Sequence, residues 1–486
     1  MEPGEMDVRV LSRPSPTIYE EGAVTVFDSA ASPADSRLIE RLGEGTEGTD
    51  LAAPPVVLPD FCHKEKSEMP SSIAVATKGA IRPTLTDAAL NCGMALVTLD
   101  VERPTAAAVT DFYREVAERF PNPPNWRRDL SYKEVLRAAT EGADFAAERY
   151  DLSDTELDRI EERGRMEIDS LGGAAQAKKD LPWLVVQMGR LRFGTIGPST
   201  HFLELQEVEE VLDQEAAERI GVHQGQVTLQ FHNGGGVLTG QIGALYARRK
   251  AASRMLRTEM SVQKPLAHLA TSRSLSQMKR RLATYFSEDC VSIPMDDEDG
   301  RRALLATRLS MNYGFAYRMA TYAALRSIAS STLGATTKLV VDSPHNSVYE
   351  EEVGGEKAFV HRHNACRAFP GELMPDHPAF SKTGQPILLP GTNRTSSYLC
   401  VPAADAHRSL YTACHGSGSI ISAFEKSGRS GTDPRRRTTA RYRYDGAAPQ
   451  EVPQLDDNGV NEALGILTTN GLVRPVARMR PFAVLT

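Results

Sequence analysis

Strand-like and helix-like patterns are segregated along this chain instead of alternating. Short β-branched runs broken by proline, glycine and aspartate extend from "PPVVLPDF" to "MALVTLDV" and predict strands. Helix-prone charged segments follow between residues 130 and 190, among them "DTELDRIEERGRM", and a long helical section covers residues 242–330. Strand patterns return in "KLVVDSPHNSVYEEEV", "EKAFVHRHNACRAF" and "LVRPVARMRPFAVLT". This order favours an α+β architecture over repeated βαβ units.

The 486 residues would allow about three domains on length alone. No repeat or clean linker divides the chain after residue 55, so we expect one large catalytic domain over residues 55–486. Residues 1–54 are rich in proline, glycine, serine and acidic residues and are predicted to be a variable N-terminal extension. This segment is either loosely ordered or a poorly patterned start of the fold.

The net charge of −7 gives no overall attraction to nucleic acid, so any such contact needs a local basic patch. The run "DPRRRTTARYRYDG" interleaves arginine with tyrosine and is either such a patch or a solvated loop. The six cysteines are scattered without a CxxC pair, and the N-terminus lacks a secretory pattern. No apolar run approaches the ~20 residues that cross a bilayer. We therefore expect a cytoplasmic protein with no membrane association.

Five residues stand beside glycine or another small residue, each at the end of an apolar strand-like run: Cys92, His201, His232, His345 and His415. The run before His201 is "RLRFGTIG". Each residue taken singly could be structural, but residues at strand ends can project into a shared cleft. A Cys/His₃ set suits a divalent metal, and ligand softness alone favours zinc. The remaining histidine could then be a nucleophile toward phosphorus.

Glycines follow two of these histidines, in "TACHGSGS" and in "HNGGGVLTG". Such glycines expose backbone N–H groups that can cradle phosphate oxygens. The chain has no GxSxG elbow, no Walker A loop and no GxGxxG after a strand. Ser-His-Asp hydrolysis therefore finds no support in the sequence.

The motifs "LPDFCHK", "NCGM", "GTIGPSTHFLE", "FHNGGG", "VHRHNACRAFPGE", "LPGTNRTSSY", "CHGSGS" and "VARMRPFAV" resemble, in order and spacing, the tRNA-splicing ligase RtcB family from about residue 55 to the C-terminus. The resemblance implies a single domain with mixed or antiparallel sheets around a central metal cleft and a helical insertion. It also implies an RNA ligase that joins a 3′-phosphate or 2′,3′-cyclic phosphate end to a 5′-hydroxyl end. The implied cofactors are GTP and one or two Mn²⁺ ions. The implied partners are tRNA halves or damaged RNA, and an archease-type activator.

Carried over residue by residue, the resemblance makes His415 the histidine that accepts GMP from GTP. It makes Cys92 a metal-bridging ligand and His201, His232 and His345 histidine ligands, with manganese in place of zinc. Glu204 matches the residue that reads guanine, and Asp60 matches an acidic residue near the metals. The remaining positions implied to contact the guanylate are Thr200, Asn346, Pro390, Gly391, Thr392, Asn393, Ser397, Gly416, Ser417, Gly418 and Thr486.

The chain departs from the family pattern inside this implied site. A metal-binding aspartate is replaced by Ala89 and an asparagine by Thr200, and family cations are replaced at Gly236, His363, Ser419 and Thr486. Each charge-assisted hydrogen bond removed in this way is worth roughly 1.5–3 kcal/mol. Asp87 could supply the missing carboxylate, and nearby cations are available in Arg362, Arg367 and Arg394. Three interpretations follow. The first is an RNA ligase. The second is a divergent paralogue that binds metal, nucleotide or RNA ends, or performs another phosphoryl transfer, without ligation. The third, which rests on ligand softness alone, is a zinc hydrolase.

Overall fold

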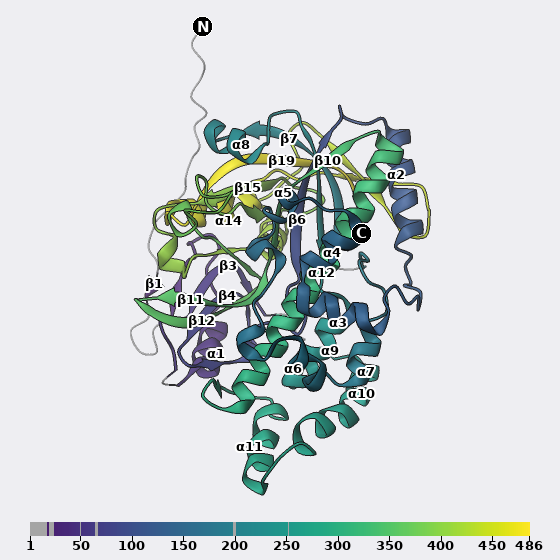
Figure 1. Ribbon diagram of the computed structural model, residues 1–486. Coiled ribbons are helices and arrows are strands. Elements are labelled where there is room, and N and C mark those ends of the chain that lie inside the picture. The colour runs from purple at the N-terminus through teal and green to yellow at the C-terminus, as the bar shows by residue number, and fades with distance from the viewer. Residues whose placement is uncertain (1–16, 19–23, 49, 64–66, 198–200, 251) are drawn as a thin grey trace.

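The computed structural model describes residues 17–18, 24–48, 50–63, 67–197, 201–250 and 252–486. Two β-sheets occupy one part of the molecule, and most of the helices gather beside and below them in the view of Figure 1. The α+β architecture predicted from the sequence is confirmed, with mostly antiparallel sheets and a helical segment between the strands.

The larger sheet has nine strands in the order β10-β6-β8-β7-β19-β15-β14, with β17 beside β19 and β18 beside β17. All pairings are antiparallel except that of β17 with β19. The bounds are β6 (Gly93–Asp100), β7 (Phe202–Val211), β8 (Val227–Asn233), β10 (Thr336–Pro344), β14 (Ile387–Leu389), β15 (Ser397–Pro402), β17 (Thr438–Tyr442), β18 (Gln450–Pro453) and β19 (Val473–Leu485).

The smaller sheet has the order β1-β2-β3-β4-β12-β11, and two further pairs, β13 with β16 and β5 with β9, connect the layers. Helix α1 (Ser36–Thr46) packs on this sheet through Ile39 and Leu42, so residues 24–48 contribute to its core. The strand bounds are β1 (Thr17–Ile18), β2 (Thr25–Val26), β3 (Val56–Cys62), β4 (Ser71–Thr77), β5 (Ala80–Ile81), β9 (Ile293–Pro294), β11 (Asn346–Val353), β12 (Glu356–His363), β13 (Ala365–Arg367) and β16 (Thr412–Cys414).

Strand β6 shows how the larger sheet builds two cores. Ala95 and Val97 face the helices, whereas Met94 and Leu96 face the opposite side with β14 and β15. This alternation follows from the two-residue period of a strand. Both faces are apolar, so the strand is buried on both sides, as its unbroken "GMALVTL" predicts.

The helical segment centres on α12 (Glu298–Leu333), which packs against α2, α3, α4 and α9. Short helices α10 and α11 extend away from it toward the bottom of Figure 1. The other bounds are α2 (Ala106–Arg119), α3 (Tyr132–Glu141), α4 (Ala143–Tyr150), α5 (Asp154–Leu157), α6 (Gly173–Asp180), α7 (Trp183–Met188), α8 (Gln214–Ile220), α9 (Gly236–Tyr246), α10 (Arg254–Lys264), α11 (Leu275–Tyr285), α13 (Gly418–Lys426) and α14 (Asn458–Thr469).

Three local expectations were wrong. The run "RLRFGTIG" is not a strand, because Arg192 and Gly194 adopt φ of 57° and 68° and turn the chain. Cys92 immediately precedes β6 and His201 immediately precedes β7, so these two residues lie before the first residues of strands and do not follow strands. The segment "DTELDRIEERGRM" is helical only over α5, because Glu162 and Arg163 have φ of 55° and 50°.

Candidate functional site

One edge of the larger sheet gathers the cysteine and histidines singled out in the sequence. Cys92 precedes β6, His345 follows β10, and His232 lies near the end of β8. Neighbouring antiparallel strands run in opposite directions, so the start of β6 meets the ends of β10 and β8. His201 precedes β7 and reaches the same edge, where Phe202 pairs with His232.

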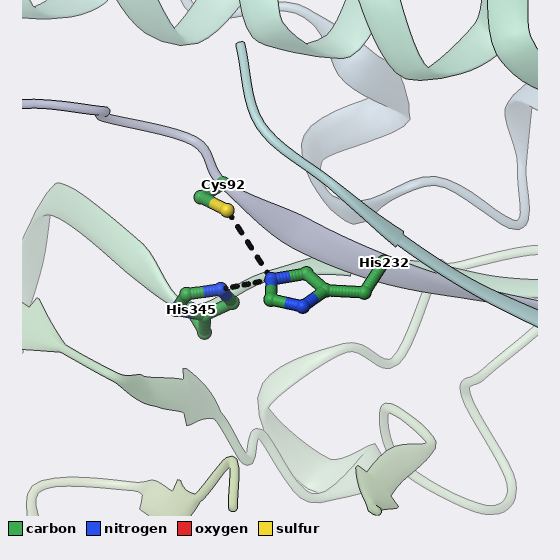
Figure 2. Close-up of side chains that lie close together, drawn as sticks. All are labelled: Cys92, His232 and His345. Carbon is green, nitrogen blue, oxygen red and sulfur yellow. Dashed lines mark hydrogen bonds between the residues drawn. The ribbon is translucent and has the colours of Figure 1, made fainter. Parts of the chain in front are cut away.

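Cys92, His232 and His345 place their ligand atoms within 4.8 Å of one another. Figure 2 shows one ring nitrogen of His232 pointing toward both other residues. This nitrogen, Nε2, is 3.2 Å from Cys92 Sγ and 2.9 Å from His345 Nε2. His201 lies beside this cluster, with its Nε2 3.7 Å from Cys92 Sγ. Burial lowers the pKa of His201, which keeps its imidazole neutral and able to donate a lone pair.

This donor set fits a divalent metal ion. Ligand atoms about 2.1–2.3 Å from one ion lie roughly 3.3–3.8 Å from each other. The spacing of Cys92 Sγ and His232 Nε2 is close to that range, and the two histidine nitrogens need to separate by only a few tenths of an ångström. Within the described residues no carboxylate belongs to the cluster.

His415 lies against the cluster but outside it. It follows β16 and stacks on His345, with ring centroids 4.1 Å apart and planes 19° apart. Its ring is 5.9 Å from that of His232, and only 4% of the residue is exposed. A side chain in this position can react beside a bound metal without being one of its ligands.

Asp60 holds the loop after His415. Its carboxylate accepts hydrogen bonds from the backbone N–H of Ser419 (2.7 Å) and from the Ser419 hydroxyl. A Cβ at Gly416 would meet Asp60 Oδ2 at 2.9 Å, so glycine permits this close approach. The hydroxyl of Ser417 donates to the carbonyl of Pro390 (2.6 Å) and ties the loop to a neighbouring pocket.

That pocket, of about 300 Å³, gathers many of the residues expected to contact a guanylate. We call it the Glu204 pocket; it is lined by Phe202, Glu204, Pro390, Gly391, Thr392, Asn393, Ser397, Arg441, Val484 and Thr486. Residues as far apart in the sequence as Phe202 and Thr486 meet here because β7 and β15 both pair with β19. Burial raises the pKa of Glu204 to about 8, and Gln206 Nε2 donates to it at 2.7 Å.

The other described residues expected to contact the guanylate are not among those that line the Glu204 pocket. Asn346 Oδ1 accepts from the backbone N–H of Asn364, and the Asn346 carbonyl accepts from the N–H of Asn91. Gly416 and Gly418 flank Ser417 at the start of α13. Thr200 lies outside the described residues.

The three arginines considered as replacement cations have partners of their own. Arg362 binds Glu351 through two nitrogens (2.6 and 2.8 Å) and donates to the Thr412 hydroxyl. Arg394 binds Glu425 at 2.7 Å. Arg367 pairs with Glu162 at 2.5 Å, and its guanidinium lies over two aromatic rings. None of the three lines the Glu204 pocket.

The structure shows the surroundings of three substituted positions and gives a steric reason for one of them, Gly236. Asp87 Oδ1 accepts from the backbone N–H of Ala89 (2.9 Å), and Ala89 borders a second cavity next to His201. Gly236 has φ of 69°, and a Cβ there would meet the Tyr317 ring at 2.5 Å. His363 is buried in β12, paired with Asn346 in the sheet.

Sequence reasoning missed Arg318, a fully buried residue of α12. Its guanidinium binds Asp342 through two nitrogens (2.7 and 2.8 Å). It also donates to the carbonyl and side-chain oxygen of Asn91, next to Cys92. The sequence carries a signal for it, since an arginine inside the apolar run "MNYGFAYRMATY" needs a buried partner.

Comparison with known proteins agrees with this geometry. The family model described as "tRNA-splicing ligase RtcB" matches residues 50–486. The chain belongs to the RtcB family. The described residues include no helix with the length and apolar character that a membrane span requires.

Individual RtcB relatives are distant and differ in length. A "tRNA-splicing ligase RtcB" of Thermococcus kodakarensis is 27% identical over 484 residues, covering 93% of each chain. An "RNA-splicing ligase RtcB" of Mycobacterium tuberculosis is 26% identical, covering 84% of this chain and 90% of its own. The Pyrococcus furiosus relative is 28% identical over 81% of this chain, which spans only 39% of that relative's length.

Proposed function

We propose that this chain is an RNA ligase that joins 3′-phosphate or 2′,3′-cyclic phosphate ends to 5′-hydroxyl ends, using GTP and Mn²⁺ through a histidine–GMP intermediate. The observation that carries the proposal is the position of His415. It stacks on His345 of the metal-type cluster, and the following loop is bonded to the Glu204 pocket through Ser417 and Pro390.

The reaction begins with the neutral imidazole of His415, which attacks the α-phosphorus of GTP. An N–P bond forms and pyrophosphate leaves. A 2′,3′-cyclic phosphate end is first opened by water to a 3′-phosphate. An oxygen of the RNA 3′-phosphate then attacks the phosphorus of the GMP on His415, so that a P–O–P bond forms and the N–P bond breaks. Finally the 5′-hydroxyl attacks the activated phosphorus, a phosphodiester forms, and GMP leaves.

We assign a separate role in this reaction to each group of residues in the site. We assign guanine recognition to Glu204, which lines the Glu204 pocket together with the Gly391–Asn393 segment. Cys92, His232 and His345, with His201 beside them, would hold the metal, which offsets negative charge at the reacting phosphate. Asp60 fixes the loop that carries His415.

A second candidate is a paralogue that binds metal and nucleotide or RNA ends without sealing them. It is favoured by the absence of a carboxylate from the described cluster and by the structural partners of Arg362, Arg367 and Arg394. An archease-type activator is part of the first proposal, since it would assist formation of the histidine adduct.

The deciding experiment incubates the purified chain with α-labelled GTP and Mn²⁺, with Zn²⁺ in a parallel series. We expect an acid-labile GMP adduct that mass spectrometry locates on His415. His415→Ala should abolish it, and His407→Ala, at an exposed histidine, should not. Absence of any adduct with either metal, with and without an archease-type protein, would exclude the first candidate. An adduct without sealing of 3′-phosphate RNA would favour the second.

A further inference from the structure

A second cavity of about 300 Å³ borders the metal-type cluster at His201 and, among the described residues, shares no lining residue with the Glu204 pocket. Consecutive residues mark the division: His201 lines this cavity, and Phe202 lines the Glu204 pocket. Successive side chains of an extended segment point to opposite sides. The cavity also reaches Ala89 and the three glycines of residues 234–236.

Three arginines line this cavity, Arg119, Arg127 and Arg192, and we call it the arginine pocket. Among its described lining residues the one carboxylate is that of Asp129, which accepts from Arg127 Nε at 2.6 Å. Within the described part of the chain, the buried atoms Arg119 Nη1 and Arg192 Nε have no hydrogen-bond partner. Desolvation and the neighbouring Arg127 lower the pKa of Arg119. The pocket therefore holds positive charge that the protein itself does not neutralise.

The arginine pocket also explains the substitution at residue 236. An arginine side chain there would need a strained left-handed backbone and would collide with Tyr317, whose ring borders the pocket. Tyr317 is held in place because its hydroxyl donates to the carbonyl of Thr195 (2.8 Å). The cations beside the cluster come from α2 and from the loops around Arg127 and Arg192 instead.

An exposed aromatic ring stands at this cluster of arginines. The guanidinium of Arg192 lies 4.9 Å from the ring centre of Trp126, and 61% of Trp126 is exposed. Arginines beside an exposed aromatic ring are the combination that binds single-stranded nucleic acid, since the cations contact phosphates and the ring stacks on a base. A lone phosphate would use the arginines but not the tryptophan.

We propose that the arginine pocket binds a backbone phosphate of the RNA strand that reacts at His415, and that Trp126 stacks on one of its bases. This proposal rests on the proposed function only in taking RNA as the substrate. The Glu204 pocket and the arginine pocket, which share no described lining residue, then receive the nucleotide and the RNA strand separately.

The test measures RNA binding without GTP, so that it does not depend on guanylation. A fluorescent 12-nucleotide single-stranded RNA with a 3′-phosphate is titrated with the Mn²⁺-loaded full chain at several salt concentrations. We expect Arg119→Gln and Arg192→Gln each to weaken RNA binding about tenfold. The salt slope, which is the slope of the logarithm of the binding constant against the logarithm of the salt concentration, should become smaller by about 0.7 for each phosphate that the variant no longer neutralises. Trp126→Ala should weaken binding about tenfold and remove the quenching of tryptophan fluorescence by RNA.

Matched controls are available in the chain. Arg280 is 62% exposed and pairs with Asp297 near the far end of the helical segment, so Arg280→Gln should leave binding unchanged. Trp183 is the second tryptophan of the chain and is 65% exposed, so Trp183→Ala tests whether any exposed ring would suffice.

Labelling of His415 with GMP is measured in parallel on every variant. Reduced RNA binding with unchanged labelling supports the proposal, and reduced RNA binding supports it even if no variant is labelled. Wild-type affinity and salt slope in both arginine variants would overturn it, as would failure of the unmodified chain to bind the RNA. Reduced labelling with unchanged RNA binding would assign the arginines to GTP and would also overturn it.

Discussion

The His415 imidazole stacks on that of His345, with ring centroids 4.1 Å apart, while His345 Nε2 lies 2.9 Å from His232 Nε2. One histidine ring thus separates the candidate nucleophile from the centre of the metal-type cluster. The stack limits the freedom of His415, which is not one of the three residues of the cluster.

The first prediction concerns the order of importance of the ligands. His232 Nε2 lies close to both Cys92 Sγ and His345 Nε2, whereas His201 Nε2 approaches the cluster at its edge, 3.7 Å from Cys92 Sγ. We expect His232→Ala to weaken metal binding about 100-fold and His201→Ala about tenfold, with His415→Ala unchanged. Equilibrium dialysis with Mn²⁺ and Zn²⁺ checks the order, and equal decreases in affinity at His201 and His415 would contradict it.

The second prediction concerns Arg318, which holds Asn91 and Asp342 at the strand ends that carry Cys92 and His345. Arg318→Met leaves the Asp342 carboxylate buried and should cost about 3–5 kcal/mol of unfolding free energy. Metal affinity should fall about 10- to 100-fold. Urea denaturation and metal titration measure the two effects.

Arg281 provides the control for Arg318, because it forms a buried pair with Asp299 away from the cluster. Arg302 also lies 3.5 Å from Asp299, so Arg281→Met should lower stability by less than Arg318→Met and should leave metal affinity unchanged. An equal decrease of metal affinity in both variants would show that Arg318 acts only through global stability.

The third prediction concerns the substituted glycine at residue 236. Gly236→Ala should lower the free energy of unfolding by about 2 kcal/mol or more, because φ is 69° and the new methyl group would collide with Tyr317. Gly240 lies in the same helix with no atom within 4 Å of an added Cβ, so Gly240→Ala should stabilise by about 0.5–1 kcal/mol. Thermal unfolding of the pair checks the sign, and a neutral Gly236→Ala would refute the steric explanation.

The fourth prediction concerns pH. Burial raises the pKa of Glu204 from its ordinary value near 4.5 to about 8. Between these values the folded chain retains a proton that the unfolded chain has released, so stability falls as pH rises through the window. The slope is at most about 1.4 kcal/mol per pH unit from this group.

Glu204→Gln should remove the pH-dependent loss of stability that Glu204 causes. The free energy of unfolding of the variant, relative to that of the unmodified chain, should therefore increase from pH 5 to pH 8 and then level off. Glu207→Gln, at a half-exposed position of the same strand, is the matched control. Parallel denaturation curves at pH 5, 6.5, 8 and 9 provide the comparison. A gain that does not change with pH would contradict the raised pKa.

The sequence by itself determined the class of fold and marked residues that lie together in the structure. Segregated strand and helix patterns predicted the α+β architecture, and small residues beside Cys92, His232, His345 and His415 marked positions that do meet. These signals are local: they depend on the period of a strand and on which residues flank it. The local pattern wrongly predicted a strand at "RLRFGTIG", where close packing of Gly194 against Ala320 of α12 favours a turn.

Only the tertiary structure decided which strand ends share an edge and what surrounds them. The order β10-β6-β8-β7 places the cluster at one edge, and Arg318 holds it from a helix more than 200 residues beyond Cys92. The arginine pocket likewise joins α2 to a loop near Arg192, and Tyr317 closes the space at Gly236. Such relationships depend on strand order and on packing between distant segments, and neither is encoded in the short-range periodicity of the chain.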